Sequence, residues 1–144
     1  MNPQLNIKLV DSSLPIPEYK TPGAVAFDLY SRIDMAIPPK TLKLVPLNVI
    51  IKIPEGYMLA MFSRSSLPVK KGLMAANSIG IFDQDYCGEE DEWKFEAYNY
   101  TEELVKIKKG ERIAQAMLIK FDRASFNQVN EMTEPSRGGI GSTG

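Results

Sequence analysis

The sequence predicts one all-β domain of the sandwich or barrel type. Its 144 residues are enough for a single ordinary domain with its own core. Glycine and proline number 10 each and divide the chain into short pieces. Several of these pieces alternate apolar and polar residues, and no internal repeat is visible. Short alternating runs between turn residues favour a sandwich or barrel over a helical bundle.

The expected strands follow from this alternation. Apolar residues at every second position predict strands at 5–9 and 93–97, and a Val-, Ile- and Leu-rich run predicts strand structure over 42–53. Pro54 ends that run, and a Pro-Glu-Gly turn leads into a further strand at 57–62.

The last two segments of the chain differ in character. The apolar run 111–121 fits the period of either a helix or a strand, and its strand-rich neighbours favour a strand. Residues 134–144 carry four glycines and a proline and cannot form a packed element alone. We therefore predict a β domain over 1–133 and a flexible arm over 134–144.

The composition narrows the possible functions. Charged residues make up 24% and the formal net charge is −1, so there is no general electrostatic case for binding nucleic acid or an anionic membrane. No apolar run approaches the length of a membrane span, and the first residues lack a signal-peptide pattern. We expect a cytoplasmic protein with no nucleic-acid or membrane partner. The single cysteine, Cys87, excludes an internal disulfide and a multi-cysteine zinc site.

The chain contains no histidine. This excludes Ser-His-Asp and Cys-His nucleophile systems, histidine-containing zinc sites and histidine general bases. Any chemistry must use carboxylates, basic side chains, backbone amides and hydroxyls, with or without a hard cation held through oxygen.

Residues 63–72 form the first segment that is suited to chemistry. Arg64 lies beside Ser65 and Ser66, directly after an apolar strand and before a proline. A guanidinium fork, hydroxyls and free backbone N–H groups are what a phosphate group needs. The alternative is an ordinary basic, polar turn.

Residues 77–88 form the second such segment and look like a β-hairpin with polar groups on its inner side. Asp83 and Asp85 are two residues apart and would point to the same side of an extended strand, where one could act as a general base or hold a metal's water shell. Asn77 could read a base edge. The alternative is a solvated turn, with Tyr86 in the core or at its rim.

Two further segments carry weaker signals. Gln115 stands between two alanines in an apolar run, which indicates either a buried amide that needs partners or an edge strand with Gln115 in solvent. The glycines of 137–144 would let backbone amides approach a polyphosphate beside Arg137. The alternative for this last segment is a disordered tail.

Taken together and in order, five segments resemble the motifs of the trimeric, all-β dUTPase (deoxyuridine triphosphate nucleotidohydrolase) family. They run from near the start of the chain to its last residue: 24–31 (AVAFDLYS), 64–66 (RSS), 80–88 (GIFDQDYCG), 110–115 (GERIAQ) and 137–144 (RGGIGSTG). The resemblance implies a distorted jelly-roll barrel or sandwich and a dUTP diphosphatase that hydrolyses dUTP to dUMP and pyrophosphate.

The resemblance also implies roles for single residues around the nucleoside. Asp83 corresponds to the aspartate that orients the attacking water. Tyr86 corresponds to the tyrosine that lies under the deoxyribose and excludes a 2′-hydroxyl. Asn77, together with backbone groups, corresponds to the residue that recognises the uracil edge. Gly80, the first residue of the 80–88 motif, is also expected to bind the substrate.

Other positions correspond to the family's phosphate and metal contacts. Arg64 and Ser65 match the phosphate-gripping motif, with Ser66 beside them, and Gln115 matches a phosphate-contacting glutamine. Asp28 matches an aspartate near the water shell of Mg²⁺, and it would act only through water. The arm would close over the nucleotide, on a site that other subunits of a homotrimer build, through Arg137, Ile140, Gly141 and Ser142.

Three departures from the family pattern stand out. Ile140 occupies the place of a phenylalanine that stacks on the base, and the arm is two residues short before its glycine pair, so Arg137 lies closer to that pair than usual. Cys87 replaces a common arginine. The acidic stretch 89–92 is expected on an outer turn, at a subunit contact or as a second cation site.

Two other functions compete with dUTP hydrolysis. A dCTP deaminase, including a bifunctional form, shares the fold and an Arg-Ser-Ser segment, but the 83–86 motif and the Gly-Ser-Thr-Gly end fit the hydrolase better. A non-catalytic nucleotide-binding regulator could retain every one of these residues.

Overall fold

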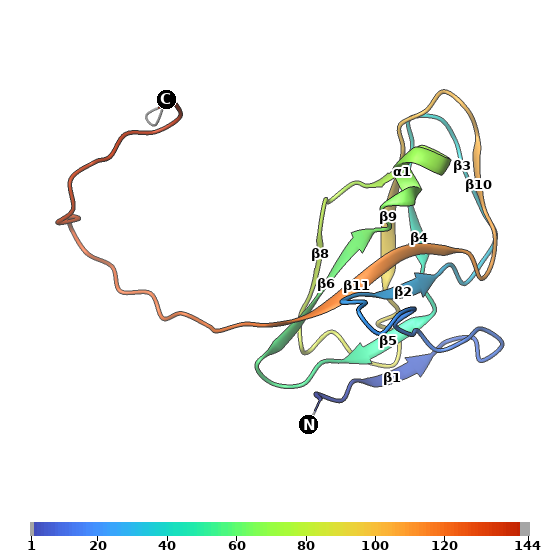
Figure 1. The fold of residues 1–144 in the computed structure, drawn as a ribbon, viewed down its shortest axis with the longest axis horizontal. Helices are drawn as coiled ribbons and strands as arrows, with labels where there is room; N and C mark the ends of the chain where they lie inside the picture. The colour runs from blue at the N-terminus through green and yellow to red at the C-terminus, as the bar shows by residue number, and fades with distance from the viewer. Residues whose placement is uncertain (1, 142–144) are drawn as a thin grey trace.

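The computed structural model describes residues 2–141 and contains eleven strands and one short helix in that range (Figure 1). In chain order these elements are β1 (Asn6–Leu9), β2 (Phe27–Tyr30), β3 (Met35–Ile37), β4 (Leu42–Pro46), β5 (Val49–Lys52), β6 (Tyr57–Ser63), α1 (Ser66–Lys71), β7 (Leu73–Ala75), β8 (Gly80–Phe82), β9 (Lys94–Asn99), β10 (Val105–Ile107) and β11 (Arg112–Lys120). The all-β prediction is confirmed.

The strands form four small antiparallel sheets that enclose one core. A four-stranded sheet has the order β2-β11-β6-β8, and a three-stranded sheet has the order β4-β9-β7. Two-stranded ribbons, β1-β5 and β10-β3, complete the body. Each of the expected strand regions contains strand structure, and 42–53 is divided into β4 and β5.

Alternation in β9 shows how the sequence builds this core. Phe95, Ala97 and Asn99 are buried, whereas Lys94, Glu96 and Tyr98 point to the other face. The core side chains come from nearly every strand, and the largest that are fully buried include Trp93, Phe95, Leu29, Ile37, Leu47, Ile51 and Leu59. Their burial is the main favourable contribution to folding.

The apolar run 111–121 is a strand, as predicted. β11 lies between β2 and β6 and pairs with both. The edge-strand alternative for Gln115 is therefore wrong, because residues on both sides of β11 are hydrogen-bonded to neighbouring strands.

Two local features differ from the expectation: one helix was not predicted, and one expected hairpin is absent. Residues 66–71 form helix α1, which ends at Gly72 with a left-handed φ of 67°. The 77–88 segment is not a hairpin, because it contains one strand, β8, which pairs with β6. Asp83 and Asp85 also lie in a turn and not on one side of an extended strand.

The acidic stretch 89–92 has a structural role at its last residue. The Glu92 carboxylate accepts hydrogen bonds from Arg32 Nε at 2.7 Å, Arg32 Nη2 at 2.9 Å and the Asn48 backbone N–H at 2.9 Å. The hydrogen bond to Glu92 raises the pKa of Arg32 above its ordinary value. Asn48 itself has a φ of 69° and is buried, so this pair holds a strained turn in place.

Residues after β11 leave the body of the molecule. From 122 to 141 every side chain is exposed, and the chain runs outward from the end of β11 (Figure 1, orange to red). This extended segment begins well before residue 134, inside the predicted β domain. Within the part of the chain that the structure describes, no helix is long and apolar enough to cross a membrane.

Candidate active site

Four predicted site residues line one cavity, which we call the loop pocket. Asn77, Gly80, Asp83 and Tyr86 surround a cavity of about 470 Å³ at the end of β8. Its other lining residues are Leu44, Met61, Ile81, Phe82, Lys94 and Glu96. Apolar side chains with a few polar groups are the usual composition of a small-molecule site.

Aromatic rings pack against one another at the loop pocket. The Phe82 ring stacks on the buried Trp93 ring with centroids 3.6 Å apart and planes 9° apart. The Tyr86 ring lies 6.3 Å from the Phe82 ring at 37°. Phe82 immediately precedes Asp83, so the stack fixes the root of the loop that carries both polar residues.

Glycine at position 80 keeps the pocket open. A Cβ at Gly80 would lie 3.2 Å from Met61 Cε and 3.5 Å from Met61 Cβ, which is close enough to force Met61 to move. Gly80 is itself buried, in register with Met61 on β6. A side chain at position 80 would therefore have to be accommodated by a shift of the flexible Met61 side chain.

A second cavity of about 240 Å³, the grip pocket, contains Arg64 and Ser66. Its other lining residues are Leu67, Lys70, Lys71, Glu111 and Arg112. Ser65 is the N-cap residue of α1, and its hydroxyl forms no capping hydrogen bond. Gln115 lies on β11 beside this region and donates from Nε2 to the Ser63 carbonyl at 3.1 Å.

Asp28 joins the two arginines of the grip pocket. Arg64 Nε donates to Asp28 Oδ1 at 3.0 Å, and Arg112 Nη1 donates to Asp28 Oδ2 at 2.9 Å. The Asp28 side chain is 12% exposed. Charge-assisted hydrogen bonds of this kind are stronger than neutral ones, so they hold the Arg64 guanidinium in one orientation.

An ion pair between Glu18 and Lys20 lies near Arg112. The hydrogen bond from Lys20 lowers the pKa of the Glu18 carboxyl, and the positive charge of Arg112 makes a smaller contribution in the same direction.

The arm residues are not brought to either pocket of this chain. Arg137, Ile140 and Gly141 lie on the exposed segment that runs away from the body (Figure 1). Ser142 lies outside the described residues. The loop pocket and the grip pocket also share no lining residue.

Both carboxylate oxygens of Asp28 accept hydrogen bonds from guanidinium groups. Among residues 2–141, no group of three or more His, Cys, Asp or Glu side chains is placed to hold a metal ion.

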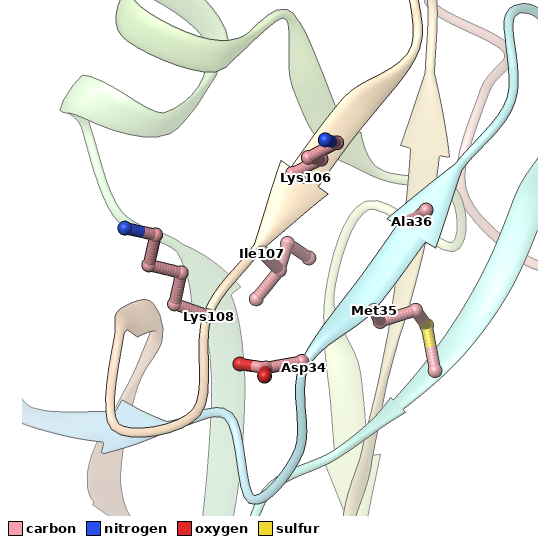
Figure 2. Close-up of a pocket in the computed structure, with 6 residues that line it drawn as sticks. All are labelled: Asp34, Met35, Ala36, Lys106, Ile107 and Lys108. Atoms are coloured by element: carbon pink, nitrogen blue, oxygen red, sulfur yellow. The ribbon is translucent and has the colours of Figure 1, made fainter.

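A third cavity, of about 350 Å³, contains none of the predicted residues. It lies between β3 and β10 and is lined by Asp34, Met35, Ala36, Lys106, Ile107 and Lys108 (Figure 2). The Asp34 carboxylate already accepts the Lys109 backbone N–H at 2.8 Å.

Comparison with known proteins identifies the family. The family model for dUTPase matches residues 12–144. The chain belongs to the dUTPase family. Among curated dUTPase relatives, deoxyuridine 5′-triphosphate nucleotidohydrolase of Dictyoglomus turgidum is 36% identical over an alignment that covers 96% of each chain. The enzyme of the same name from Nautilia profundicola is 38% identical, over 98% of this chain and 99% of its own.

Solved dUTPase structures have the same fold. The dUTPase of Streptococcus mutans superposes with a TM-score of 0.77 at 29% identity and covers 83% of this chain and 98% of its own. A mutant dUTPase of phage 80alpha superposes with a TM-score of 0.85 at 25% identity and covers 99% of both chains. The jelly-roll class predicted from the resemblance to dUTPases is thus confirmed.

Sequence reasoning missed several residues of the two candidate pockets. Arg112 falls within the 110–115 motif but was not assigned to the site, and its ion pair with Asp28 joins two distant segments, which no local pattern reveals. Lys94 and Glu96 line the loop pocket. Their positions opposite the buried Phe95 and Ala97 could have indicated that they face away from the core.

Proposed function

We propose that this chain is a dUTP diphosphatase that hydrolyses dUTP to dUMP and pyrophosphate. Membership of the dUTPase family supports this function. The observation that carries it is the loop pocket, where Asn77, Asp83 and Tyr86 line one cavity. These residues supply an amide for a base edge, a carboxylate for a water molecule and a ring for a sugar.

Asp83 is the proposed base. Its carboxylate orients a water molecule and accepts a proton from it as the water oxygen bonds to phosphorus and the anhydride bond breaks, which releases pyrophosphate. With no histidine in the chain, a carboxylate is the natural group for this role. Tyr86 would pack against the deoxyribose and leave no space for a 2′-hydroxyl.

The grip pocket is the proposed phosphate site. The guanidinium of Arg64, oriented by Asp28, and the hydroxyls of Ser65 and Ser66 are donors for phosphate oxygens. The Ser65 hydroxyl makes no capping hydrogen bond to α1 and is available for such a contact. Gln115, on the neighbouring strand β11, is a further proposed donor.

The dUTPase family generally uses Mg²⁺, and we infer that this chain does so too. A Mg²⁺ ion would neutralise charge on the triphosphate and orient it, with most ligands supplied by phosphate oxygens and water. Asp28 is the proposed contact of this chain to that water shell. Depletion with EDTA should abolish turnover, and added Mg²⁺ should restore it.

We also propose that the active form is a homotrimer with shared sites, in a cytoplasmic setting. The supporting observation is that the loop pocket, the grip pocket and the arm are three separate regions of one chain. A site that needs all three can be completed when different copies contribute them. The arm, ordered on a bound triphosphate, would then exclude water.

Product analysis tests the function directly. Incubation with dUTP and Mg²⁺ should yield dUMP and pyrophosphate in equal amounts. Release of ammonia from dCTP would instead identify a deaminase, and tight dUTP binding without turnover would identify a regulator.

A further inference from the structure

The turn that carries Asp83 is tied to another part of the chain by the side-chain amide of Gln84. Residues 83–86 form a turn closed by the Tyr86 N–H, which donates to the Asp83 carbonyl at 3.3 Å. Gln84 lies at the first central position of this turn and is half-buried. Asp83 and Tyr86, on either side of it, are both exposed.

The Gln84 amide makes two hydrogen bonds to a different part of the chain. Its Nε2 donates to the Pro54 carbonyl at 3.0 Å and to the Tyr57 carbonyl at 3.1 Å. Pro54 lies in the connection between β5 and β6, where Gly56 has a φ of 77°, and Tyr57 is the first residue of β6. Both N–H bonds of one amide group are thus directed at a turn about 30 residues away in the sequence.

These two hydrogen bonds constrain the part of the chain after Asp83, which the Phe82–Trp93 stack does not hold. Phe82 on Trp93 fixes the chain before Asp83, but the backbone after it has no strand partner until β9. The Gln84 bonds hold the turn between Asp83 and Tyr86 at its middle. Misplacement of a catalytic group by about 1 Å is enough to cost roughly 100-fold in rate.

We propose that Gln84 is a positioning residue for hydrolysis, which places the Asp83 carboxylate and the Tyr86 ring by tying their turn to the Pro54–Tyr57 connection. This inference rests on the proposed dUTP hydrolysis for its kinetic consequence. Gln84 does not line the loop pocket, and its side chain contacts two carbonyl groups of the body.

The test compares three variants at saturating dUTP. Gln84→Met keeps the length of the side chain and removes both donors, so kcat should fall about tenfold. Gln84→Lys keeps N–H donors on a flexible stem and should stay within about threefold of the unmodified protein. Gln4→Met makes the same substitution at an exposed amide of the N-terminal segment and should leave kcat unchanged.

A second measurement does not depend on turnover. Cys87 is the only cysteine, is half-buried and lies three residues after Gln84, with its Sγ 3.5 Å from the Gln84 carbonyl. Release of the turn should speed the reaction of Cys87 with a thiol reagent several-fold in Gln84→Met but not in Gln4→Met. Thermal unfolding confirms that each variant is folded.

Two results would overturn the proposal. One is a folded Gln84→Met variant whose kcat is within twofold of normal. The other is a Gln84→Lys variant whose kcat falls as much as that of Gln84→Met. If Gln84→Met does not fold, Gln84→Asn, whose amide is one methylene shorter, replaces it in the same comparison. Absence of dUTP turnover in the unmodified protein would contradict the proposed function alone, because Cys87 labelling still reports whether Gln84 holds the turn.

Discussion

The grip pocket and the loop pocket are organised in different ways. In the grip pocket the key arginines are already paired inside the chain, each with one oxygen of Asp28. In the loop pocket Asp83 and Tyr86 are exposed, and the supporting contacts are made by their neighbours Phe82 and Gln84.

This difference follows from what each pocket has to do. A guanidinium that binds phosphate must keep its orientation, and a partly buried carboxylate provides that orientation before the substrate arrives. A carboxylate that accepts a proton must be free to contact water, so the structure holds its backbone and leaves its side chain available. The two pockets should therefore respond differently to substitution.

The largest expected effect is at the free carboxylate. Asp83→Asn keeps the shape of the side chain but cannot accept a proton, so kcat should fall by at least about 100-fold. Binding of a non-hydrolysable dUTP analogue should stay within a few-fold of normal. Steady-state kinetics and calorimetric titration measure the two quantities, and unchanged turnover at saturating dUTP would exclude Asp83 as the base.

Subunit mixing tests whether the loop pocket and the arm act across subunits. A variant that lacks 137–144 and an Asp83→Asn variant should each be inactive. If one subunit lends its aspartate and another its arm, random exchange in trimers should restore about a quarter of the sites. Absence of any recovery in trimers that have demonstrably exchanged subunits would show that each chain uses its own arm.

The next effect concerns the paired arginines. Asp28→Ala removes the common acceptor of Arg64 and Arg112 and should lower the free energy of unfolding by about 2 kcal/mol, because two charge-assisted hydrogen bonds are lost at a partly exposed site. The KM for dUTP should rise about tenfold as Arg64 loses its orientation. Urea unfolding and kinetics provide the two measurements.

Asp34→Ala is the matched control for that variant. Its carboxylate accepts one backbone N–H and lines the separate cavity between β3 and β10 (Figure 2). Stability should decrease slightly while KM stays unchanged. An equal rise in KM for both variants would mean that lost stability, and not the orientation of Arg64, controls substrate binding.

The sequence predicted the features that depend on local periodicity. Alternation located β1 and β9, and the ambiguous run at β11 was resolved by its strand-rich neighbours. Helix α1 was missed because a six-residue helix with Pro68 inside it has too few turns to show a period. The segment 77–88 was mistaken for a hairpin because its one strand, β8, pairs with β6, and pairing between distant strands leaves no local signal.

The same limit applied to the site. Asn77, Gly80, Asp83 and Tyr86 are close in sequence, so one motif predicted residues that line one cavity. The Arg112–Asp28 and Gln84–Pro54 contacts join segments far apart in the chain. Such contacts depend on the register of β11 against β2 and on the path of the β5–β6 connection, which composition and spacing do not specify.

The smallest expected effect tests whether the arm covers the base by contact area. Ile140 is fully exposed in the single chain, at 111% of its reference area. If it covers uracil through dispersion, Ile140→Phe adds aromatic stacking and should tighten dUTP binding by at most about tenfold. Ile140→Gly should weaken binding and lower turnover, because the arm closes less often and water enters the phosphate site.

The comparison of ligands makes this last prediction specific. Both effects should vanish with dUMP if the arm orders only on a full triphosphate, and the arm should resist protease with a non-hydrolysable dUTP analogue but not with dUMP. Met132→Gly, at another exposed position of the same extended segment but outside the arm motif, is the control and should leave dUTP binding unchanged. Equal protease protection with both ligands, or kinetics indifferent to Ile140→Gly, would show that the arm does not close on the triphosphate, and the site would then depend on the loop and grip pockets alone.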